Sequence, residues 1–333
     1  MFKYLKPTVL TVGLALGGAA ASAEDYVLAT ASTGGTYHPV GVAIATMTKV
    51  KLLPSEDFSL TAVNSAGSGA NIQSLASGNA DFAILQGLFG SYAANGTGPI
   101  TEPQENLRSI TMLWQNVEHF LIAKDLVQSG TVSDIAANKG VAAGMGARNS
   151  GTLGSNKALL NNLGLNIEED FDLKYAGYGP TVDALANGQI KAAGIPAGPP
   201  AGSITKLMAT NSDSVALLSV TDEEMKKMDG GRELWTRYVI PAGTYPDQDE
   251  DYNTIAQPNI LAVSDAVSEE HVYLLTKALY ENLPFLQAIH PATKAMAIDK
   301  ALAGLPLPLH PGALRYYREV GLEVPDRLIP EGS

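Results

Sequence analysis

Short apolar runs alternate with small-residue loops and helical patterns in the part of the chain that follows residue 23. The apolar runs predict strands at residues 26–31, 58–63 and 81–85. The first two run into loops at 32–36 and 64–69 and then into helical patterns at 39–50 and 70–76. Apolar runs bounded by glycine-containing loops and helices are typical of a parallel sheet covered on both faces. The pattern therefore predicts a βαβαβ unit in an α/β protein.

The same alternation returns between residues 140 and 195. Strands are expected at 140–145, 173–176 and 190–195, and helices at 152–163 and from about Pro180. Residues 75–84 also align with residues 185–194 at an offset of 110, with four of the ten positions identical. Chance matching among common small residues is the alternative, but the shared order of elements favours two lobes built on one plan.

The remaining segments indicate how the two lobes are connected. Residues 119–123 and 259–263 are isolated strand candidates that bracket the second unit, so we expect them to be the two crossings between the lobes. Residues 268–303 read as helical, and residues 315–320 as a helix that packs back on the first lobe. Two crossings form a hinge, and the cleft between two lobes is the expected ligand site. Lobe I is assigned to residues 24–115 and 265–333, and lobe II to residues 116–264.

Residues 1–23 have the features of a cleaved secretory signal. Lys3 and Lys6 precede an apolar run at residues 8–20, and residues 21–23 (Ala-Ser-Ala) fit an A-x-A cleavage site. The run is too short to span a bilayer, and an N-terminal membrane anchor is the alternative interpretation. Because this segment carries two lysines and no acidic residue, the mature chain keeps 20 basic and 34 acidic residues and a charge of −14. We expect a periplasmic protein.

The composition excludes several classes of function. The 333 residues include 22 lysines and arginines, 34 acidic residues and no cysteine. An acidic balance argues against a nucleic-acid partner, because binding to phosphates needs a basic surface. The lack of cysteine excludes disulfides, thiol catalysis, iron–sulfur clusters and cysteine-ligated zinc. The fold must therefore rest on its own core, which a chain of this length can supply.

The predicted loops lie beyond the carboxyl ends of the strands, where open parallel sheets bind ligands. They are rich in Gly, Ser, Thr, Asn and Tyr and contain a single cation, Arg148. A loop that leads into a helix presents free N–H groups and the positive end of the helix to an anion. Further donors are offered by the hydroxyls of Thr36, Ser68, Ser150 and Thr152. These residues can also serve as N-caps and turns, but four such loops on two lobes favour an anion-binding cleft.

Motifs that would indicate an enzyme or a metal site are missing from the sequence. It has no G-x-x-x-x-G-K-[ST] phosphate loop and no G-x-S-x-G nucleophile elbow. Asp247, Asp249 and Asp251 have the spacing of a calcium loop, but Tyr252 stands where that loop needs glycine. The five histidines show no metal-ligand spacing, and the loops hold no evident pair of carboxylates. We therefore predict a protein that binds a ligand without catalysis, cofactor or metal.

Five stretches carry a resemblance to a known family: TGGTYHPVG at 33–41, ADFAILQ at 80–86, SGT at 150–152, IPAGTYP at 240–246 and PLHPGALRYYRE at 308–319. In this order they resemble the TRAP-associated extracytoplasmic immunogenic (TAXI) solute receptors, which serve tripartite ATP-independent periplasmic (TRAP) transporters. The resemblance implies a two-lobed type II periplasmic-binding-protein fold with a hinge and a central ligand cleft. It also implies no catalysis, and delivery of a solute to a TRAP-type membrane permease driven by an ion gradient. Known ligands of the family are mostly glutamate-like or dicarboxylate anions.

The resemblance further implies which residues contact the ligand. The matched positions are Gly35, Thr36, Tyr37, Ser68, Gln86, Ser150, Gly151 and Thr152. The family usually has a glycine before Ser-Gly-Thr, whereas Arg148 and Asn149 stand here. A guanidinium at this point could pair with an extra carboxylate, so both residues join the candidate site. The alternative is that the Arg148 side chain points to solvent.

The leading hypothesis from the sequence is an extracytoplasmic receptor that closes around a small organic anion. Two other hypotheses stay open. One is a periplasmic enzyme on the same fold that acts on a small anion, and the other is the solute receptor of an ABC importer.

Overall fold

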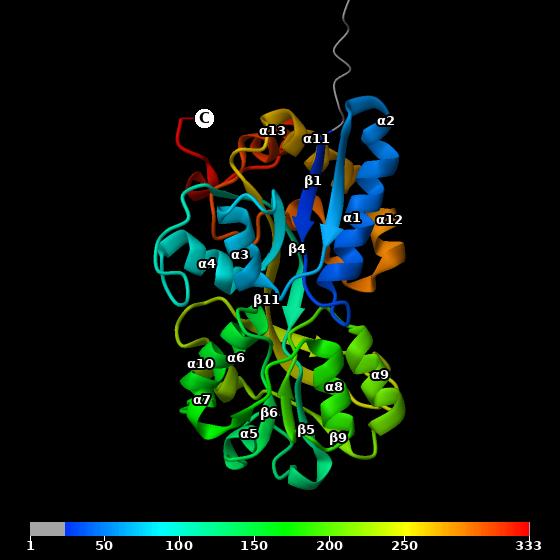
Figure 1. The fold of residues 1–333 in the computed structure, drawn as a ribbon, viewed down its shortest axis with the longest axis vertical. Helices are drawn as coiled ribbons and strands as arrows, with labels where there is room; N and C mark the ends of the chain where they lie inside the picture. The colour runs from blue at the N-terminus through cyan, green and yellow to red at the C-terminus, as the bar shows by residue number, and fades with distance from the viewer. Residues whose placement is uncertain (1–23, 333) are drawn as a thin grey trace, which may run out of the picture.

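The computed structural model describes residues 24–332, so the predicted signal peptide lies outside the described residues. The first three strands follow the predicted apolar runs and pair in parallel, with β1 (Glu24–Ala29) between β2 (Phe58–Val63) and β3 (Phe82–Gln86). The helices α1 (Tyr37–Lys51) and α3 (Ser68–Ala76) connect them. All five residues of β3 are buried, because helices cover the sheet on both sides (Figure 1). These elements form the core of lobe I.

Lobe II repeats this arrangement in the lower half of Figure 1. Its strands β6 (Ala142–Gly144), β7 (Asp172–Leu173) and β8 (Ala192–Gly194) pair in parallel, and α6 (Gly151–Asn162) and α8 (Tyr178–Ala186) connect them. The offset of 110 residues places α3 on α8 and the start of β3 on the start of β8. The sequence echo therefore reflects a repeated structural unit.

The sequence predicted parallel sheets, but both sheets also contain antiparallel strands. In lobe II the order is β7-β6-β8-β5-β9, and β5 (Phe120–Ala123) runs antiparallel to both β8 and β9 (Val215–Leu218). In lobe I the corresponding antiparallel strand is β11 (Tyr252–Ser264), beside β3. In each lobe an antiparallel strand from outside the βαβαβ unit thus pairs with the third strand of that unit.

The two crossings between the lobes are β4 (Leu107–Val117) and β11, which pair antiparallel with each other. The first part of β11 pairs with β10 (Thr236–Ile240), and its second part pairs with β3. The structure corrects the predicted crossings here. Residues 120–123 lie inside the lobe II sheet, and residues 259–263 pair with β3 in the lobe I sheet. The long strand β4 was not predicted.

Further helices surround the two sheets, and part of the predicted helical region at 268–303 is not α-helical. Beyond α11 (Glu269–Glu281) and α12 (Leu283–Ile289), two 3-10 turns at Pro291–Ala295 and Ile298–Lys300 replace the expected helix. Pro291 lies two residues after the end of α12, and proline lacks the N–H that would continue a helix. The other helices are α2 (Leu53–Glu56), α4 (Gly87–Asn95), α5 (Ser133–Ala137), α7 (Ile167–Asp170), α9 (Gly202–Asn211), α10 (Asp222–Asp229) and α13 (Pro311–Glu319). Across residues 24–332, no helix is both long and apolar enough to cross a membrane.

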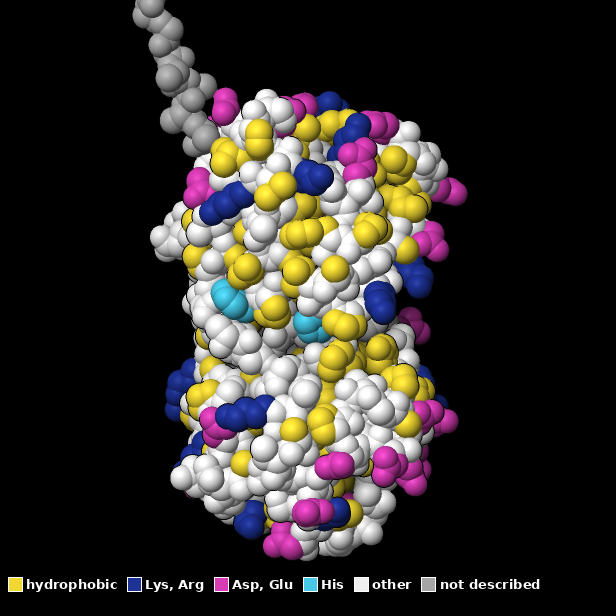
Figure 2. Space-filling view, turned by 90° about the vertical axis from the view of Figure 1, so that its right-hand side faces the viewer, with side chains coloured by type: hydrophobic (Ala, Val, Ile, Leu, Met, Phe, Trp, Pro, Cys, Tyr) yellow, Lys and Arg dark blue, Asp and Glu magenta, His cyan; other side chains and the backbone are white. Residues whose placement is uncertain are grey.

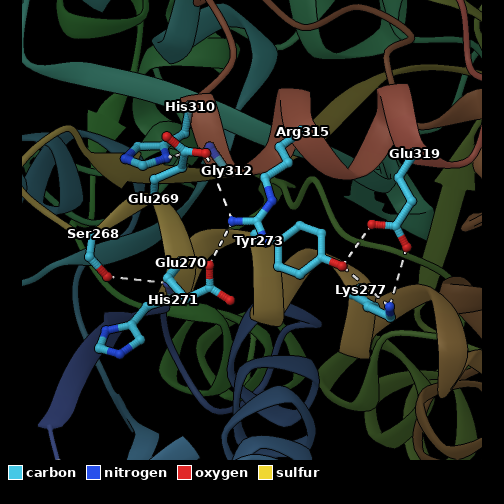
Figure 3. Close-up of polar contacts among 10 residues, drawn as sticks. All are labelled: Ser268, Glu269, Glu270, His271, Tyr273, Lys277, His310, Gly312, Arg315 and Glu319. Carbon is cyan, nitrogen blue, oxygen red and sulfur yellow. Dashed lines mark hydrogen bonds and ion pairs between the residues drawn. The ribbon is translucent and has the colours of Figure 1, made fainter.

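The C-terminal helix α13 packs back on α11 in lobe I, as predicted. Figure 3 shows the polar contacts that fix this pair of helices. The Arg315 guanidinium lies 3.9 Å from the centre of the Tyr273 ring and forms a 2.6 Å ion pair with Glu270. The Tyr273 hydroxyl donates a 2.7 Å hydrogen bond to Glu319, which also pairs with Lys277. The segment from 308 to 319 thus contributes to the packing of lobe I.

Candidate ligand-binding site

A cavity of about 170 Å³ lies between the lobes, at the carboxyl ends of the parallel strands. Eight of the ten candidate residues line it, namely Gly35, Thr36, Tyr37, Ser68, Gln86, Ser150, Gly151 and Thr152. The remaining wall is formed by Ala31, Ser32, Ser65, Ala66, Gly67, Asn116, Ala147, Ala176, Gly177, Tyr178, Pro196 and Ala197. The loops of the two βαβαβ units therefore face each other across one shared cavity.

Four helices begin at this cavity, two from each lobe. The lining residues include the N-cap and the first residue of α1, α3, α6 and α8: Thr36 and Tyr37, Gly67 and Ser68, Ser150 and Gly151, Gly177 and Tyr178. The first N–H groups of a helix have no acceptor within the helix. Only α6 has a side-chain cap, in which Ser150 Oγ accepts a 3.0 Å hydrogen bond from Leu153 N. The other three helices present first-turn N–H groups that no N-cap side chain satisfies.

The cavity wall carries no ionisable acid or base other than tyrosine. None of the residues that line it is Lys, Arg, His, Asp or Glu. Its positive potential therefore comes from the helix N-termini, each of which acts as a partial positive charge of about one half. Four such ends around a small cavity favour one anionic group, since backbone N–H groups bind carboxylate, phosphate and sulfate in this way.

The first loop places Thr36 and Tyr37 in the wall, but their hydroxyls have protein partners. Thr36 Oγ1 donates a 2.8 Å hydrogen bond to the carbonyl of Gly198 in lobe II. The Tyr37 hydroxyl donates to Asn259 Oδ1 at 2.5 Å, and burial raises the pKa of this phenol well above its usual value. Thr36 thus joins the two lobes, and Tyr37 stays neutral.

Ser68, Gln86 and Gly151 meet at the centre of the cavity. Ser68 Oγ accepts a 3.0 Å hydrogen bond from Gln86 N, which holds the start of α3 against the end of β3. Gln86 is buried, and its Oε1 atom has no hydrogen-bond partner within the described structure. A Cβ atom at Gly151 would lie 2.7 Å from both Gln86 Oε1 and Ser68 Oγ. A side chain at position 151 would therefore force Gln86 and Ser68 to shift or the lobes to separate.

In lobe II, Ser150 and Thr152 are held by internal hydrogen bonds. In addition to its role as a cap, the Ser150 hydroxyl donates to the carbonyl of Ala147 at 2.6 Å. Thr152 Oγ1 lies 2.9 Å from the Tyr178 hydroxyl, which donates to the carbonyl of Pro196. Because the phenol proton is used by Pro196, Thr152 is the donor in the pair. Both side chains therefore shape the wall, and the donors left for a ligand are mainly backbone N–H groups.

Arg148 and Asn149 are the two candidate residues that the structure does not bring to the cavity. The Arg148 guanidinium lies 3.8 Å from the centre of the Tyr175 ring, and its side chain is exposed. Asn149 has a left-handed backbone with a φ of 58°, and its Nδ2 donates a 2.7 Å hydrogen bond to Gln73 Oε1 in lobe I. Arg148 therefore does not reach the cavity in which it was expected to pair with a carboxylate of the ligand, and Asn149 links the lobes outside the cavity.

Tyr178 and Asn116 line the cavity and were missed from the sequence. Tyr178 stands in a predicted loop, 110 residues after Ser68, and the internal repeat was a signal for it. Asn116 lies at the end of β4, where its Oδ1 atom is buried without a partner among the described residues. It could not be placed, because the strand that carries it was not predicted.

The two lobes touch each other directly around the cavity. Besides the contacts of Thr36 and Asn149, Ala70 N donates to the carbonyl of Asn149 at 2.9 Å, and Ser203 N donates to the carbonyl of Gly34 at 3.1 Å. On the face drawn in Figure 2, the surfaces of the lobes meet at a waist. The structure therefore corresponds to a closed arrangement of the lobes.

Residues 28–321 match the model of the NMT1-like family. The chain belongs to the NMT1-like family. The match covers both lobes and every residue of the cavity wall. The two βαβαβ units and the cavity between them therefore lie within the region matched by one family model.

Solved structures with a similar fold include periplasmic binding proteins. The NMT1-like chain is similar to periplasmic binding protein BugD, with 16% identity, a TM-score of 0.53 and coverage of 90% of this chain and 98% of that one. It is also similar to a protein from Bordetella bronchiseptica RB50, with 16% identity, a TM-score of 0.52 and coverage of 91% of this chain and 90% of that one. A third similar structure is the ligand-binding component of an ABC-type import system from Staphylococcus aureus, solved with zinc bound. Its identity is 9% and its TM-score 0.50, with coverage of 92% of this chain and 96% of that one. These similarities show the two-lobed type II periplasmic-binding-protein fold.

Proposed function

We propose that the protein is an extracytoplasmic solute receptor that binds a small organic anion between its lobes and delivers it to a TRAP-type membrane permease. The observation that carries this proposal is the convergence of four helix N-termini on one cavity without charged side chains. An anion there gains hydrogen bonds from N–H groups that otherwise lack acceptors. The contacts between the lobes complete the enclosure.

The size and charge of the cavity narrow the ligand. Its volume of about 170 Å³ is close to that of engineered cavities of about 150 Å³ that hold a benzene molecule, so the ligand has about ten non-hydrogen atoms or fewer. A glutamate-like amino acid and a small dicarboxylate both meet this limit. With Arg148 outside the wall, a second full negative charge would have no cationic side chain beside it. Glutamate carries two carboxylates, but its own ammonium group brings its net charge to −1, so it is a better fit than a dicarboxylate with a charge of −2.

A thermal-shift screen of amino acids, keto acids and dicarboxylates tests the binding function. A ligand that binds the folded state raises the melting temperature with its concentration. We expect glutamate-like anions to stabilise the mature protein, and calorimetry to give one site per chain. If no organic anion shifts the melting temperature, the proposed ligand class is wrong.

The receptor of an ABC importer is the second candidate, and the similarity to an ABC-type import component from Staphylococcus aureus favours it. Transport into vesicles that contain the permease encoded beside the gene separates the two systems. Uptake that needs an ion gradient and no ATP supports the TRAP assignment, whereas uptake that needs ATP supports an ABC importer. The enzyme alternative has no support in the cavity wall, which offers no carboxylate, imidazole or amine as a general acid or base.

A further inference from the structure

Glu118 is a buried carboxylic acid at the hinge, between the crossing strand β4 and strand β5. It is 1% exposed. Its backbone ties the two crossings together, because Glu118 N donates to the carbonyl of Ile255 at 2.9 Å and its carbonyl accepts from Thr254 Oγ1 at 2.7 Å. Oε1 accepts a long 3.4 Å hydrogen bond from Trp235 Nε1, and Oε2 has no partner within the described range. This side chain is therefore fixed in a dry position and only weakly hydrogen bonded.

No positive charge compensates the carboxyl group. The groups that face it are the Trp235 indole ahead of β10 and the Gln257 amide on β11, both neutral donors. The neighbouring His119 is itself buried, and burial lowers its pKa to about 4, so its ring is neutral above pH 5. Removal from water raises the pKa of Glu118 to about 8, and the indole of Trp235 and the nearby amide of Gln257 offset only part of that rise. At neutral pH the side chain is therefore the uncharged acid.

The charge state of Glu118 bears on the ligand cavity. Asn116, two residues earlier on the same crossing, lines the cavity. The charge of Glu118 also raises the pKa values of the cavity tyrosines Tyr37 and Tyr178, in addition to the larger effect of their burial, so its field reaches both lobes of the site. The cavity holds an anion with neutral donors alone. An ionised Glu118 would place a full negative charge behind that anion, in a medium that screens it poorly.

We propose that Glu118 is a proton-binding site of the receptor and that the closed, anion-loaded state forms only when Glu118 carries its proton. The inference rests on the proposed function, because it needs an anionic ligand. Below pH 8 the proton is already in place. Above pH 8 each bound anion takes up one proton from solvent onto the Glu118 carboxylate, and the proton returns to solvent when the anion leaves.

Calorimetric titration with sodium L-glutamate at pH 7 and pH 9, in two buffers with different ionisation enthalpies, tests this proposal. If only the protonated form binds, the apparent affinity follows the protonated fraction, so the wild type binds about tenfold more weakly at pH 9 than at pH 7. It should take up close to one proton per glutamate at pH 9. Glu118→Gln, which mimics the uncharged acid, should lose this tenfold difference and the uptake. The amine of glutamate titrates equally in both proteins, so the difference between them isolates Glu118.

Glu224→Gln is the matched control, because Glu224 is a second buried glutamate and lies outside the cavity wall and the hinge. It should keep the tenfold pH effect. The proposal is overturned if the change in affinity between pH 7 and pH 9 is the same in the wild type and in Glu118→Gln.

A second measurement needs no ligand and separates this inference from the proposed function. The free energy of unfolding of the free protein, measured with urea from pH 6 to pH 8, should fall more steeply with pH in the wild type than in Glu118→Gln. This is expected because, between pH 6 and pH 8, Glu118 keeps its proton in the folded state but has lost it in the unfolded state. If L-glutamate fails to bind at pH 7, the proposed ligand is wrong while this comparison still decides on Glu118. If the free energies of unfolding of the wild type and Glu118→Gln change equally with pH, Glu118 is not a proton-binding site.

Discussion

Asn149 Nδ2 in lobe II donates a 2.7 Å hydrogen bond to Gln73 Oε1 in lobe I. The carbonyl of the same asparagine accepts a hydrogen bond from Ala70 N, so one residue holds α3 through both its backbone and its side chain. Its left-handed backbone directs the carbonyl and the side chain to this helix. Asparagine adopts this conformation more readily than most residues. The pair is a latch across the outside of the ligand cavity.

Asn149→Gly should loosen the latch without straining the backbone, because glycine accepts a positive φ. Loss of one hydrogen bond of about 0.5–1.5 kcal/mol predicts a two- to tenfold loss of ligand affinity. Gln73→Ala removes the same bond from the other side. Calorimetry on both variants and on the double variant is the measurement, and the double variant should be no weaker than either single one. Losses that simply add would show that the two residues act separately.

Gly151→Ala should abolish tight binding and leave the fold intact. The added Cβ would lie 2.7 Å from Gln86 Oε1 and Ser68 Oγ, both on the opposite lobe, so the lobes cannot close fully. We expect a loss of affinity of at least 100-fold, with a melting temperature of the free protein equal to or above that of the wild type, since alanine favours helix. Small-angle scattering should show that ligand no longer makes the protein more compact. Gly202→Ala, at the start of α9 with open space around it, is the control and should bind normally.

Arg148→Ala should leave the choice of ligand unchanged. The guanidinium lies over the Tyr175 ring and outside the cavity wall, so it pairs with no part of the anion. We expect less than a twofold change in affinity for both glutamate and a dicarboxylate, measured by calorimetry at the same ionic strength. A selective loss of dicarboxylate binding would show that Arg148 contacts the ligand.

Glu224 should support the stability of lobe II at neutral pH and lose this role in acid. Burial alone would raise its pKa, but hydrogen bonds from Ser133, Thr221 and Thr131 outweigh burial and lower the pKa below its usual value. A lowered pKa in the folded state stabilises the protein above the unfolded pKa of about 4.5, and the contribution disappears as the pH falls through the folded value. Glu224→Gln should therefore unfold at lower urea than the wild type at pH 7. The difference between the two proteins should shrink below pH 4, and a constant difference would contradict the assignment.

The sequence predicted those parts of the fold that have local signals. The strands β1, β2 and β3 coincide with short runs that are mostly apolar, and the offset of 110 residues correctly related α3 to α8. Strand β4 gave no such signal, because polar residues such as Asn116 interrupt its apolar positions although they are buried. The crossings were not predicted correctly because β11 is one continuous strand, and its pairing with both β10 and β3 leaves no mark in a local pattern.

The candidate site was predictable where a loop joins a strand to a helix, and eight of its ten residues line the cavity. The direction of a long side chain was not predictable. Arg148 has a nearby aromatic ring that attracts its guanidinium, and that ring belongs to a different loop. The role of Glu118 could not be foreseen either, because its burial depends on the contact between the two crossings.

A cavity wall without charged side chains has a kinetic consequence. In the described part of the chain no cationic side chain lines the cavity to draw an anion inward, and the net charge of −12 on the chain repels it at long range. Salt weakens that repulsion, so capture should become somewhat faster as ionic strength rises. Discrimination then falls to the dissociation step, in which a solute that fails to complete the contacts between the lobes escapes before they close. Residence time, rather than speed of capture, is what distinguishes the right solute from the wrong one.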